Sequence, residues 1–189
     1  MKNKILVALV AASCCLSANA ADTYEIDPNH TAAVFAFQHF GFSTFRGKIP
    51  TQSGTVTLDP AAKTGSAEVV FDINAIATGV PKFDAHLKSK DFFEADKYPT
   101  AIFKATKFTF DGDAPSTIAG DLTIKNVTKP VTLKVTSFKC ADHPMMKVPA
   151  CGANATAKIK RTDFDVGLYA PNVSDEIELE IEIEATKQK

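Results

Sequence analysis

The clearest pattern along the chain is a strict alternation of acidic and aliphatic side chains near its C-terminus. Residues 176–184 read EIELEIEIE, so Ile177, Leu179, Ile181 and Ile183 share one parity and the glutamates share the other. A period of two is typical of a β-strand with one buried and one solvated face, because successive side chains point to opposite sides. We therefore predict a strand here, with its aliphatic face in the core and its glutamates in water.

The same alternation recurs in short segments along most of the chain. It is found at residues 34–39, 56–58, 69–73, 101–103, 108–110, 122–124, 131–135 and 157–159. Asp111-Gly112 is a turn signal that fits a hairpin after the fifth of these segments. About nine short strands at this spacing predict an all-β antiparallel fold, either a sandwich or a barrel.

One segment, residues 80–99, breaks the strand pattern. It reads VPKFDAHLKSKDFFEADKYP, and Pro81 suits the first position of a helix. Phe83, His86 and Leu87, together with Phe92 or Phe93, can share one apolar side. We predict one or two short helices within residues 80–95, packed over the sheet or across the mouth of a barrel.

The stretch FAFQHFGFSTF at residues 35–45 is unusually rich in phenylalanine. Phe35, Phe37 and His39 have one parity and Phe40 and Phe42 the other, so a turn or bulge is expected near the intervening glycine, residue 41. The partners on the other side of the first strand are small or polar, which points the Phe35 side inward. These rings could fill a core or line a hole.

The first twenty residues have the pattern of a secretory signal peptide. Lys2 and Lys4 precede an apolar run of about twelve residues, and Ala18-Asn19-Ala20 is a small-x-small cleavage site. We predict cleavage between Ala20 and Ala21, which leaves residues 21–189 as one exported domain. A lipoprotein modified at residue 14 or 15 is the less favoured alternative, since neither cysteine has a leucine three positions upstream.

Charge and cysteine content narrow the function further. The chain has 21 Lys and Arg against 22 Asp and Glu, and loss of the leader removes two of the lysines, which argues against a nucleic-acid partner. Cys140 and Cys151 are the only cysteines beyond the leader, and an even count after an export signal predicts a disulfide. Closing such a loop stabilises a fold by about 3 kcal/mol. A metal site that adds His143 is the alternative, although its spacing matches no common zinc pattern.

No arrangement of residues typical of catalysis is evident. The four histidines are dispersed and no nucleophile elbow occurs, so we expect neither a catalytic nor a metal site. Asp27 and His30 could form a polar latch at a barrel entrance, or satisfy backbone groups where a strand starts, and we favour the second. Arg161 could be a buried, hydrogen-bonded side chain or a partner for a polar ligand head, and we favour the first.

Five segments are distributed along nearly all of the chain beyond the leader: YEIDPNHTAAVFAFQHFGFSTFRGKI, GTVTLD, HLKSKDFFEADKYPTAIFKATKF, IAGDLTIKNVTKPVTLKV and IKRTDFDVG. Together these segments resemble the YceI-like family of exported bacterial proteins. The insertion FKCADHPMMKVPACG resembles a sub-branch with two cysteines. One departure is Asp165, where the family commonly has glycine after the aromatic residue.

The resemblance implies a lipocalin-like antiparallel β-barrel of about eight strands, located in the periplasm. Its interior would bind a long isoprenoid chain, either a polyprenyl lipid or an isoprenoid quinone such as ubiquinone, with no cofactor required. Burial contributes about 0.8 kcal/mol per CH₂ of ligand, so a long tail can bind with few polar contacts. Alternatives are a carrier of a fatty acid or amide, or a lipid-modifying enzyme that uses His39 or His86, although we expect no enzyme.

On this basis we expect a set of mostly apolar residues to contact the ligand. They are Phe35, Phe37, His39, Phe42, Val69, Phe71, Ile73, Leu87, Phe92, Phe103, Leu122, Ile124 and Arg161. The expected partners are the lipid itself and membrane-bound donor or acceptor proteins, with the carrier a monomer or homodimer.

Overall fold

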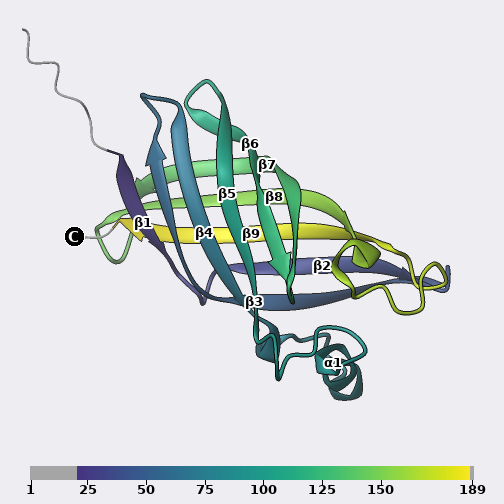
Figure 1. Cartoon of the computed structure of the whole chain (residues 1–189). Coiled ribbons are helices and arrows are strands. Elements are labelled where there is room, and N and C mark those ends of the chain that lie inside the picture. The colour runs from purple at the N-terminus through teal and green to yellow at the C-terminus, as the bar shows by residue number, and fades with distance from the viewer. Residues whose placement is uncertain (1–20, 188–189) are drawn as a thin grey trace, which may run out of the picture.

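Nine antiparallel strands form one continuous sheet that curls into a barrel (Figure 1). The computed structural model describes residues 21–187, so the predicted leader and its cleavage site after Ala20 lie outside the described residues. The strands are β1 (Asp22–Ile26), β2 (Ala32–His39), β3 (Ser43–Asp59), β4 (Thr64–Asp72), β5 (Thr100–Asp111), β6 (Ala114–Ile124), β7 (Val127–Asp142), β8 (Pro149–Lys160) and β9 (Glu176–Lys187). Three short helical elements complete the fold: η1 (Ile73–Ala75), α1 (Pro81–Lys88) and η2 (Arg161–Phe164).

The barrel closes because β9 pairs with β2, where Phe35 lies opposite Leu179. Each strand from β2 to β9 also pairs with the next along the chain, which makes an eight-stranded ring. β1 pairs with β3 and β9 beyond the start of β2, so β1 and β2 occupy one position in the ring. The predicted fold, a lipocalin-like antiparallel barrel of about eight strands with a short helix, is confirmed. Within residues 21–187, no helix is both long and apolar enough to cross a membrane.

Strand boundaries differ from the alternation pattern where a strand contains a bulge. Residues 101–103 and 108–110 were expected in separate strands but both belong to β5, whose register shifts between Ala105 and Lys107. The extra residue reverses the parity, so Phe103 and Phe108 are both buried although their numbers differ in parity. The sequence pattern also gave no sign of β1 or of the first half of β3, where apolar residues are sparse.

The loops fall into two groups at opposite ends of the barrel. The turn after β2, the connection that carries α1, the β6–β7 turn and residues 161–175 lie at one end, which we call the helix end. The turns β3–β4, β5–β6 and β7–β8 lie at the other, which we call the hairpin end. In Figure 1, α1 is carried by the long connection from β4 to β5 and projects below the strands.

The helix α1 is held to the barrel by an apolar cluster. Pro81 is at its first turn, as predicted, and the Asp84 carboxylate accepts hydrogen bonds from the backbone N–H (2.7 Å) and hydroxyl (2.6 Å) of Thr78. Leu87 is buried and shares a cluster with Phe37 and Phe92. Eight residues are too few for a stable isolated helix, so this packing determines where the helix lies.

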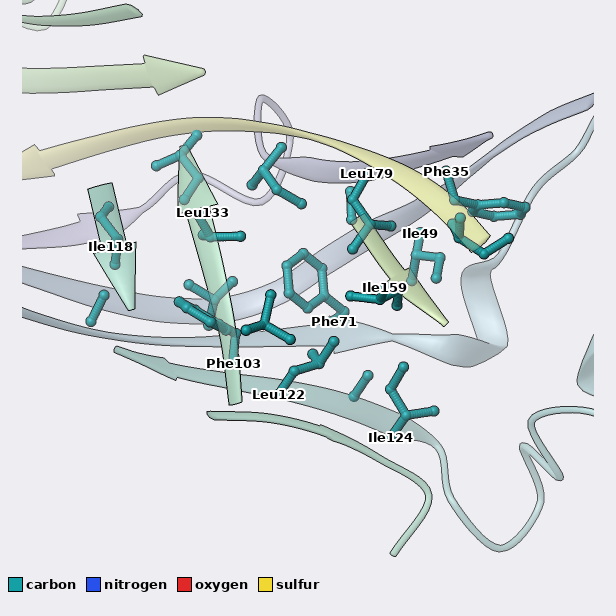
Figure 2. A pocket seen from close by; sticks show the side chains of 18 of the residues that line it. Phe35, Ile49, Phe71, Phe103, Ile118, Leu122, Ile124, Leu133, Ile159 and Leu179 are labelled. Carbon is teal, nitrogen blue, oxygen red and sulfur yellow. The ribbon is translucent and has the colours of Figure 1, made fainter. Parts of the chain in front are cut away.

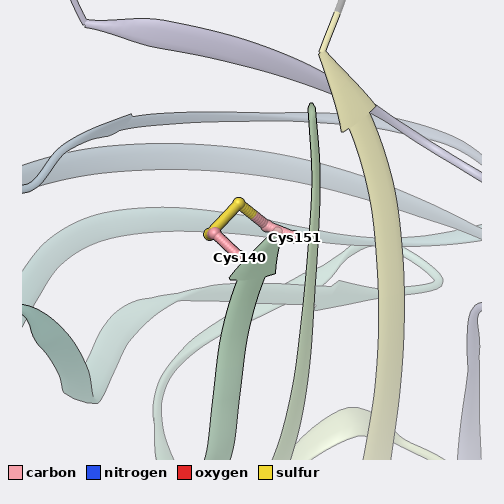
Figure 3. Close-up of a disulfide and its surroundings, with 2 residues drawn as sticks. All are labelled: Cys140 and Cys151. Carbon is pink, nitrogen blue, oxygen red and sulfur yellow. A yellow bond between two sulfur atoms is a disulfide. The ribbon is translucent and has the colours of Figure 1, made fainter. Parts of the chain in front are cut away.

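A disulfide joins the last part of β7 to the start of β8 near the hairpin end (Figure 3). Cys140 and Cys151 lie directly opposite each other in the strand register, and their sulfur atoms are bonded, which confirms the predicted bridge. The metal alternative is therefore wrong. His143 instead accepts hydrogen bonds from the backbone N–H groups of Met145 and Met146 through its Nδ1 atom.

Candidate ligand cavity

The interior of the barrel is hollow, with a cavity of about 420 Å³. All nine strands contribute side chains to its wall, and nearly all of these are aliphatic or aromatic. In Figure 2, Phe71, Phe103 and Leu133 from three different strands point into the same space. Ile177, Leu179, Ile181 and Ile183 all line it too, so the alternation of β9 does mark the inward face.

Two of the phenylalanines lie against glycines of neighbouring strands. Phe35 faces Gly47 across β2 and β3, and a Cβ added to Gly47 would come within 2.3 Å of the Phe35 ring. A Cβ added to Gly120 would come within 2.5 Å of the Phe103 ring. The missing side chains let both rings lie close to the wall, so large residues surround the space without filling it.

Most of the residues expected to contact a ligand lie in the cavity wall. They are Phe35, Phe37, His39, Val69, Phe71, Leu87, Phe92, Phe103, Leu122, Ile124 and Arg161. Two do not. Phe42 is 91% exposed because it lies in the β2–β3 turn, and Ile73 is buried in the core beyond the end of β4, outside the cavity.

The wall also contains residues that were not expected to contact a ligand. Tyr24, Phe83, Phe108, Phe138 and Tyr169 all line the cavity. Phe108 and Phe138 each follow a bulge, where simple alternation fails. Tyr169 belongs to an irregular loop, and no periodic signal marks it.

The cavity opens at the helix end. Among the described residues that line it, the exposed ones are His39, Phe40 and Tyr169. His39 and Phe40 make an edge-to-face contact at 4.6 Å, and Tyr169 contacts His86 at 6.3 Å between ring centroids. Lining residues at the hairpin end are buried or half-buried. We call the opening at the helix end the mouth.

Arg161 lines the cavity but is occupied by the backbone around the mouth. Its Nε donates to the Ser174 carbonyl (2.9 Å), Nη1 donates to the carbonyls of Val166 and Leu168 (3.0 Å each), and Nη2 donates to the Val173 carbonyl (2.8 Å). Burial lowers the pKa of Arg161, and the nearby Asp175 charge acts in the opposite direction. These bonds fix the loop that carries Tyr169, which supports the hydrogen-bonded role.

Two histidines add further polar groups to the mouth. The Nε2 atom of His86 lies 3.6 Å from a carboxylate oxygen of Asp91, and its ring contacts Phe92 edge-on at 5.1 Å. Within residues 21–187, neither His39 nor His86 is hydrogen-bonded to a hydroxyl or thiol. The mouth therefore presents two imidazole rings, and within the described residues neither ring is paired with a nucleophile of the kind that covalent catalysis uses.

Asp27 and His30 lie outside the cavity, in the break between β1 and β2. Their side chains are 2.7 Å apart, and Asp27 also accepts a hydrogen bond from the backbone of Asn29. The hydrogen bond from His30 lowers the pKa of Asp27, and the same bond raises the pKa of His30. The pair closes a local turn, in agreement with the favoured reading, and lies away from the mouth.

The fold and cavity together define a lipocalin-like barrel, and comparison with known proteins gives its family. The profile of the YceI-like domain matches residues 24–185, so the chain belongs to this family. It is similar to Protein YceI of Shigella flexneri, with 37% identity over 193 residues that cover 98% of this chain and 99% of that one.

Two solved structures are similar to this chain in fold. BcnA of Burkholderia cenocepacia has 25% identity and a TM-score of 0.72, covering 85% of this chain and 99% of that one. A polyisoprenoid binding domain from Saccharophagus degradans, implicated in plant cell wall breakdown, has a TM-score of 0.61 over 87% of this chain and 98% of its own. Its identity is only 12%, so that likeness concerns the fold alone.

Proposed function

We propose that the protein is a periplasmic carrier that holds a long isoprenoid lipid in its barrel. The ligand would be a polyprenyl lipid or an isoprenoid quinone such as ubiquinone, with its tail among the apolar walls and its head at the mouth. The observation that carries the proposal is the cavity itself, about 420 Å³ in volume and open at one end. That volume is within the usual range of small-molecule sites, roughly 300–1,000 Å³.

The chemistry of the wall supports a hydrocarbon ligand. Aromatic and aliphatic groups from every strand face the cavity, and its polar lining residues are few: Tyr24, His39, His86, Arg161 and Tyr169. Each buried CH₂ of a tail contributes about 0.8 kcal/mol, so affinity grows with chain length and needs little from the head group. An isoprenoid tail is nearly insoluble, and a protein must enclose it to carry it through water.

The proposed location and mode of action rest on other features. The signal-peptide pattern and the Cys140–Cys151 bridge support export to an oxidising compartment such as the periplasm. We propose binding without catalysis and without a resident cofactor. The polyisoprenoid binding domain of Saccharophagus degradans supports the idea that a barrel of this fold can take such a chain.

The test first identifies the lipid that is bound to the purified protein and then fills the cavity with a larger side chain. Protein purified without detergent is extracted with organic solvent, and the extract is analysed by mass spectrometry. We expect a lipid with an isoprenoid tail. The Ala67→Phe variant places a ring in the cavity wall, while Ala61→Phe places the same ring on an exposed turn. The first should lose most of the bound lipid and the second should keep it.

Other outcomes would redirect the proposal. Fatty acids or amides in the extract would indicate a carrier of another amphiphile. Equal lipid content in the Ala67→Phe and Ala61→Phe proteins would place the ligand outside the barrel. Chemical conversion of the bound lipid that disappears in a His86→Ala variant would show an enzyme.

A further inference from the structure

The mouth is surrounded by exposed apolar side chains from two loops. Phe40 is 52% exposed and Phe42 is 91% exposed in the β2–β3 turn, while Leu168 is 40% and Tyr169 is 53% exposed in the loop before β9. Phe40 and Tyr169 also line the cavity, so this surface is continuous with the interior. We call these four residues the rim.

The two loops of the rim are fastened to each other. The backbone N–H of Phe40 donates to the Asn172 carbonyl at 3.0 Å, and His39 forms a β-bridge with Val173. Gln38 and Ser174 are joined by two further hydrogen bonds of 3.0 Å. Because both loops are tied at several points, the rim presents its side chains as one surface.

The rim segments also differ in charge from the loops at the hairpin end. Residues 38–45 and 166–174 contain no Asp, Glu, Lys or Arg. The hairpin-end turns all carry charges, and the exposed Met145 and Met146 lie between Asp142 and Lys147. An apolar surface without charges fits the interfacial region of a bilayer, where aromatic side chains are favoured.

We propose that the rim docks onto the surface of a lipid bilayer and holds the mouth against it. Phe42 and Leu168 insert among the lipids, while Phe40 and Tyr169 form the passage through which an isoprenoid tail enters the cavity without crossing water. This inference rests on the proposed function, because it assigns the route by which the ligand is exchanged.

The size of the rim favours a membrane over a second copy of the chain. Four side chains with these exposures can bury on the order of 400 Å². A stable protein–protein interface buries about 800 Å² on each partner and includes charged or hydrogen-bonding groups around its edge. A bilayer requires neither a matching surface of that size nor such an edge, because binding at its surface grows with the apolar area that is buried, to which attraction to anionic lipids can add.

The experiment compares two double variants with the wild-type chain beyond the leader. Phe42→Ser with Leu168→Ser removes the rim residues that do not line the cavity, and Met145→Ser with Met146→Ser removes exposed apolar groups at the hairpin end. Each protein is floated with vesicles of phosphatidylethanolamine and phosphatidylglycerol, and transfer of ubiquinone from the same vesicles into the protein is timed.

The rim variant should bind vesicles and take up ubiquinone at least about tenfold less well, because burying one large apolar group shifts an equilibrium by about that factor. The methionine variant should behave as wild type.

Loading from detergent separates this proposal from the proposed function. Every protein is also mixed with ubiquinone in detergent, and retention is measured after the detergent is removed. Normal retention by the rim variant with slow uptake from vesicles supports docking. If no protein retains ubiquinone by either route, the proposed function fails for this ligand, and vesicle flotation alone still decides docking. Equal flotation of wild type and rim variant overturns the proposal. So does wild-type protein that does not float but sediments as a dimer, with the rim variant monomeric.

Discussion

The two ends of the barrel are built from the same strands but differ in the contacts that hold their loops together. At the hairpin end, Lys63 reaches from the β3–β4 turn to the next turn, where it donates to the Gly112 carbonyl and lies 3.1 Å from Asp113. The Cys140–Cys151 bridge ties a further pair of strands there. At the helix end, packed rings and backbone bonds from Arg161 hold the loops around an opening. The same eight-stranded ring is therefore held by covalent and polar links between its hairpins at one end, whereas residues that line the cavity are exposed at the other.

The largest expected loss of stability comes from placing a charge on the inward face of β9, and its size should depend on the position along the strand. Ile181 and Ile177 are both 6% exposed on β9, but Ile181 belongs to the main core and Ile177 to the cluster near the mouth. Ile181→Glu should lower the free energy of unfolding by several kcal/mol, because an unpaired carboxylate cannot reach water there. Ile177→Glu should cost clearly less, since water and Arg161 are close to the mouth.

Urea unfolding of both variants measures the difference, and Glu180→Gln on the solvated face of β9 serves as the control. The control should unfold close to wild type. Equal losses for Ile177→Glu and Ile181→Glu would show that the wall near the mouth is as closed to water as the middle of the barrel.

The next largest loss of stability is expected when the Cys140–Cys151 disulfide is removed. The Cys140→Ala, Cys151→Ala protein should lose about 3 kcal/mol, the cost of freeing a loop of this length in the unfolded chain. Lipid retention well below the melting temperature should not change, because the mouth lies at the opposite end. Thermal unfolding and ubiquinone retention are measured on the same samples. Two alkylated cysteines in wild-type protein treated without reductant would contradict the bridge in the exported chain.

Much of the barrel could be predicted because alternation depends on local sequence alone. Ile177 to Ile183 and the β5–β6 turn at Asp111-Gly112 follow the pattern, and both are found as expected. Bulges are decided by pairing with a neighbouring strand, which is why Phe108 was not recognised as part of the wall. The single-sequence pattern could not show that β1 and β2 share one place in the ring, since that depends on where β3 and β9 run.

The sequence pattern predicted much of the cavity wall but little of its opening. Inward parity identified Phe71 and Phe103, but Phe42 was assigned to the wall although the turn directs it outward. Tyr169 reaches the mouth only because Arg161 fixes an irregular loop by bonding to its carbonyl groups. Such long-range placement leaves no periodic trace in the sequence.

A smaller difference in stability is expected between losing a ring beside the cavity and losing a ring in filled core. Phe37 borders the cavity and contacts Phe45 (5.6 Å) and Phe83 (6.2 Å) between ring centroids, whereas Phe164 is 1% exposed and does not line the cavity. Phe164→Ala should cost about 3–5 kcal/mol, the usual loss for a packed ring. Phe37→Ala should cost less, because its ring already has empty space on one side.

Lipid retention should show the opposite order from stability. Phe37→Gln should weaken ubiquinone binding more than it weakens folding, since it puts an amide into the tail's path. Phe164→Ala should bind normally in its folded fraction. If Phe37→Ala loses as much stability as Phe164→Ala and still retains ubiquinone as wild type does, then Phe37 is an ordinary core residue.

The smallest expected effect on stability belongs to the Asp27–His30 pair, which lies outside the cavity between β1 and β2. Its hydrogen bond raises the pKa of His30 and lowers that of Asp27, so both charged forms are favoured by folding. The His30 contribution is complete below the pKa of the unfolded residue and is lost as the pH rises through the raised pKa of the folded one. The Asp27 contribution is complete above the unfolded pKa and is lost as the pH falls through the lowered one. The pair therefore stabilises most between about pH 4 and pH 6.5.

Asp27→Asn should lower the pKa of His30 toward its ordinary value in an NMR titration, and the small loss of stability should be largest within that pH window. Ubiquinone retention should be unchanged, since neither residue lines the cavity. A His30 pKa that is the same in both proteins would mean that the two side chains do not pair in solution.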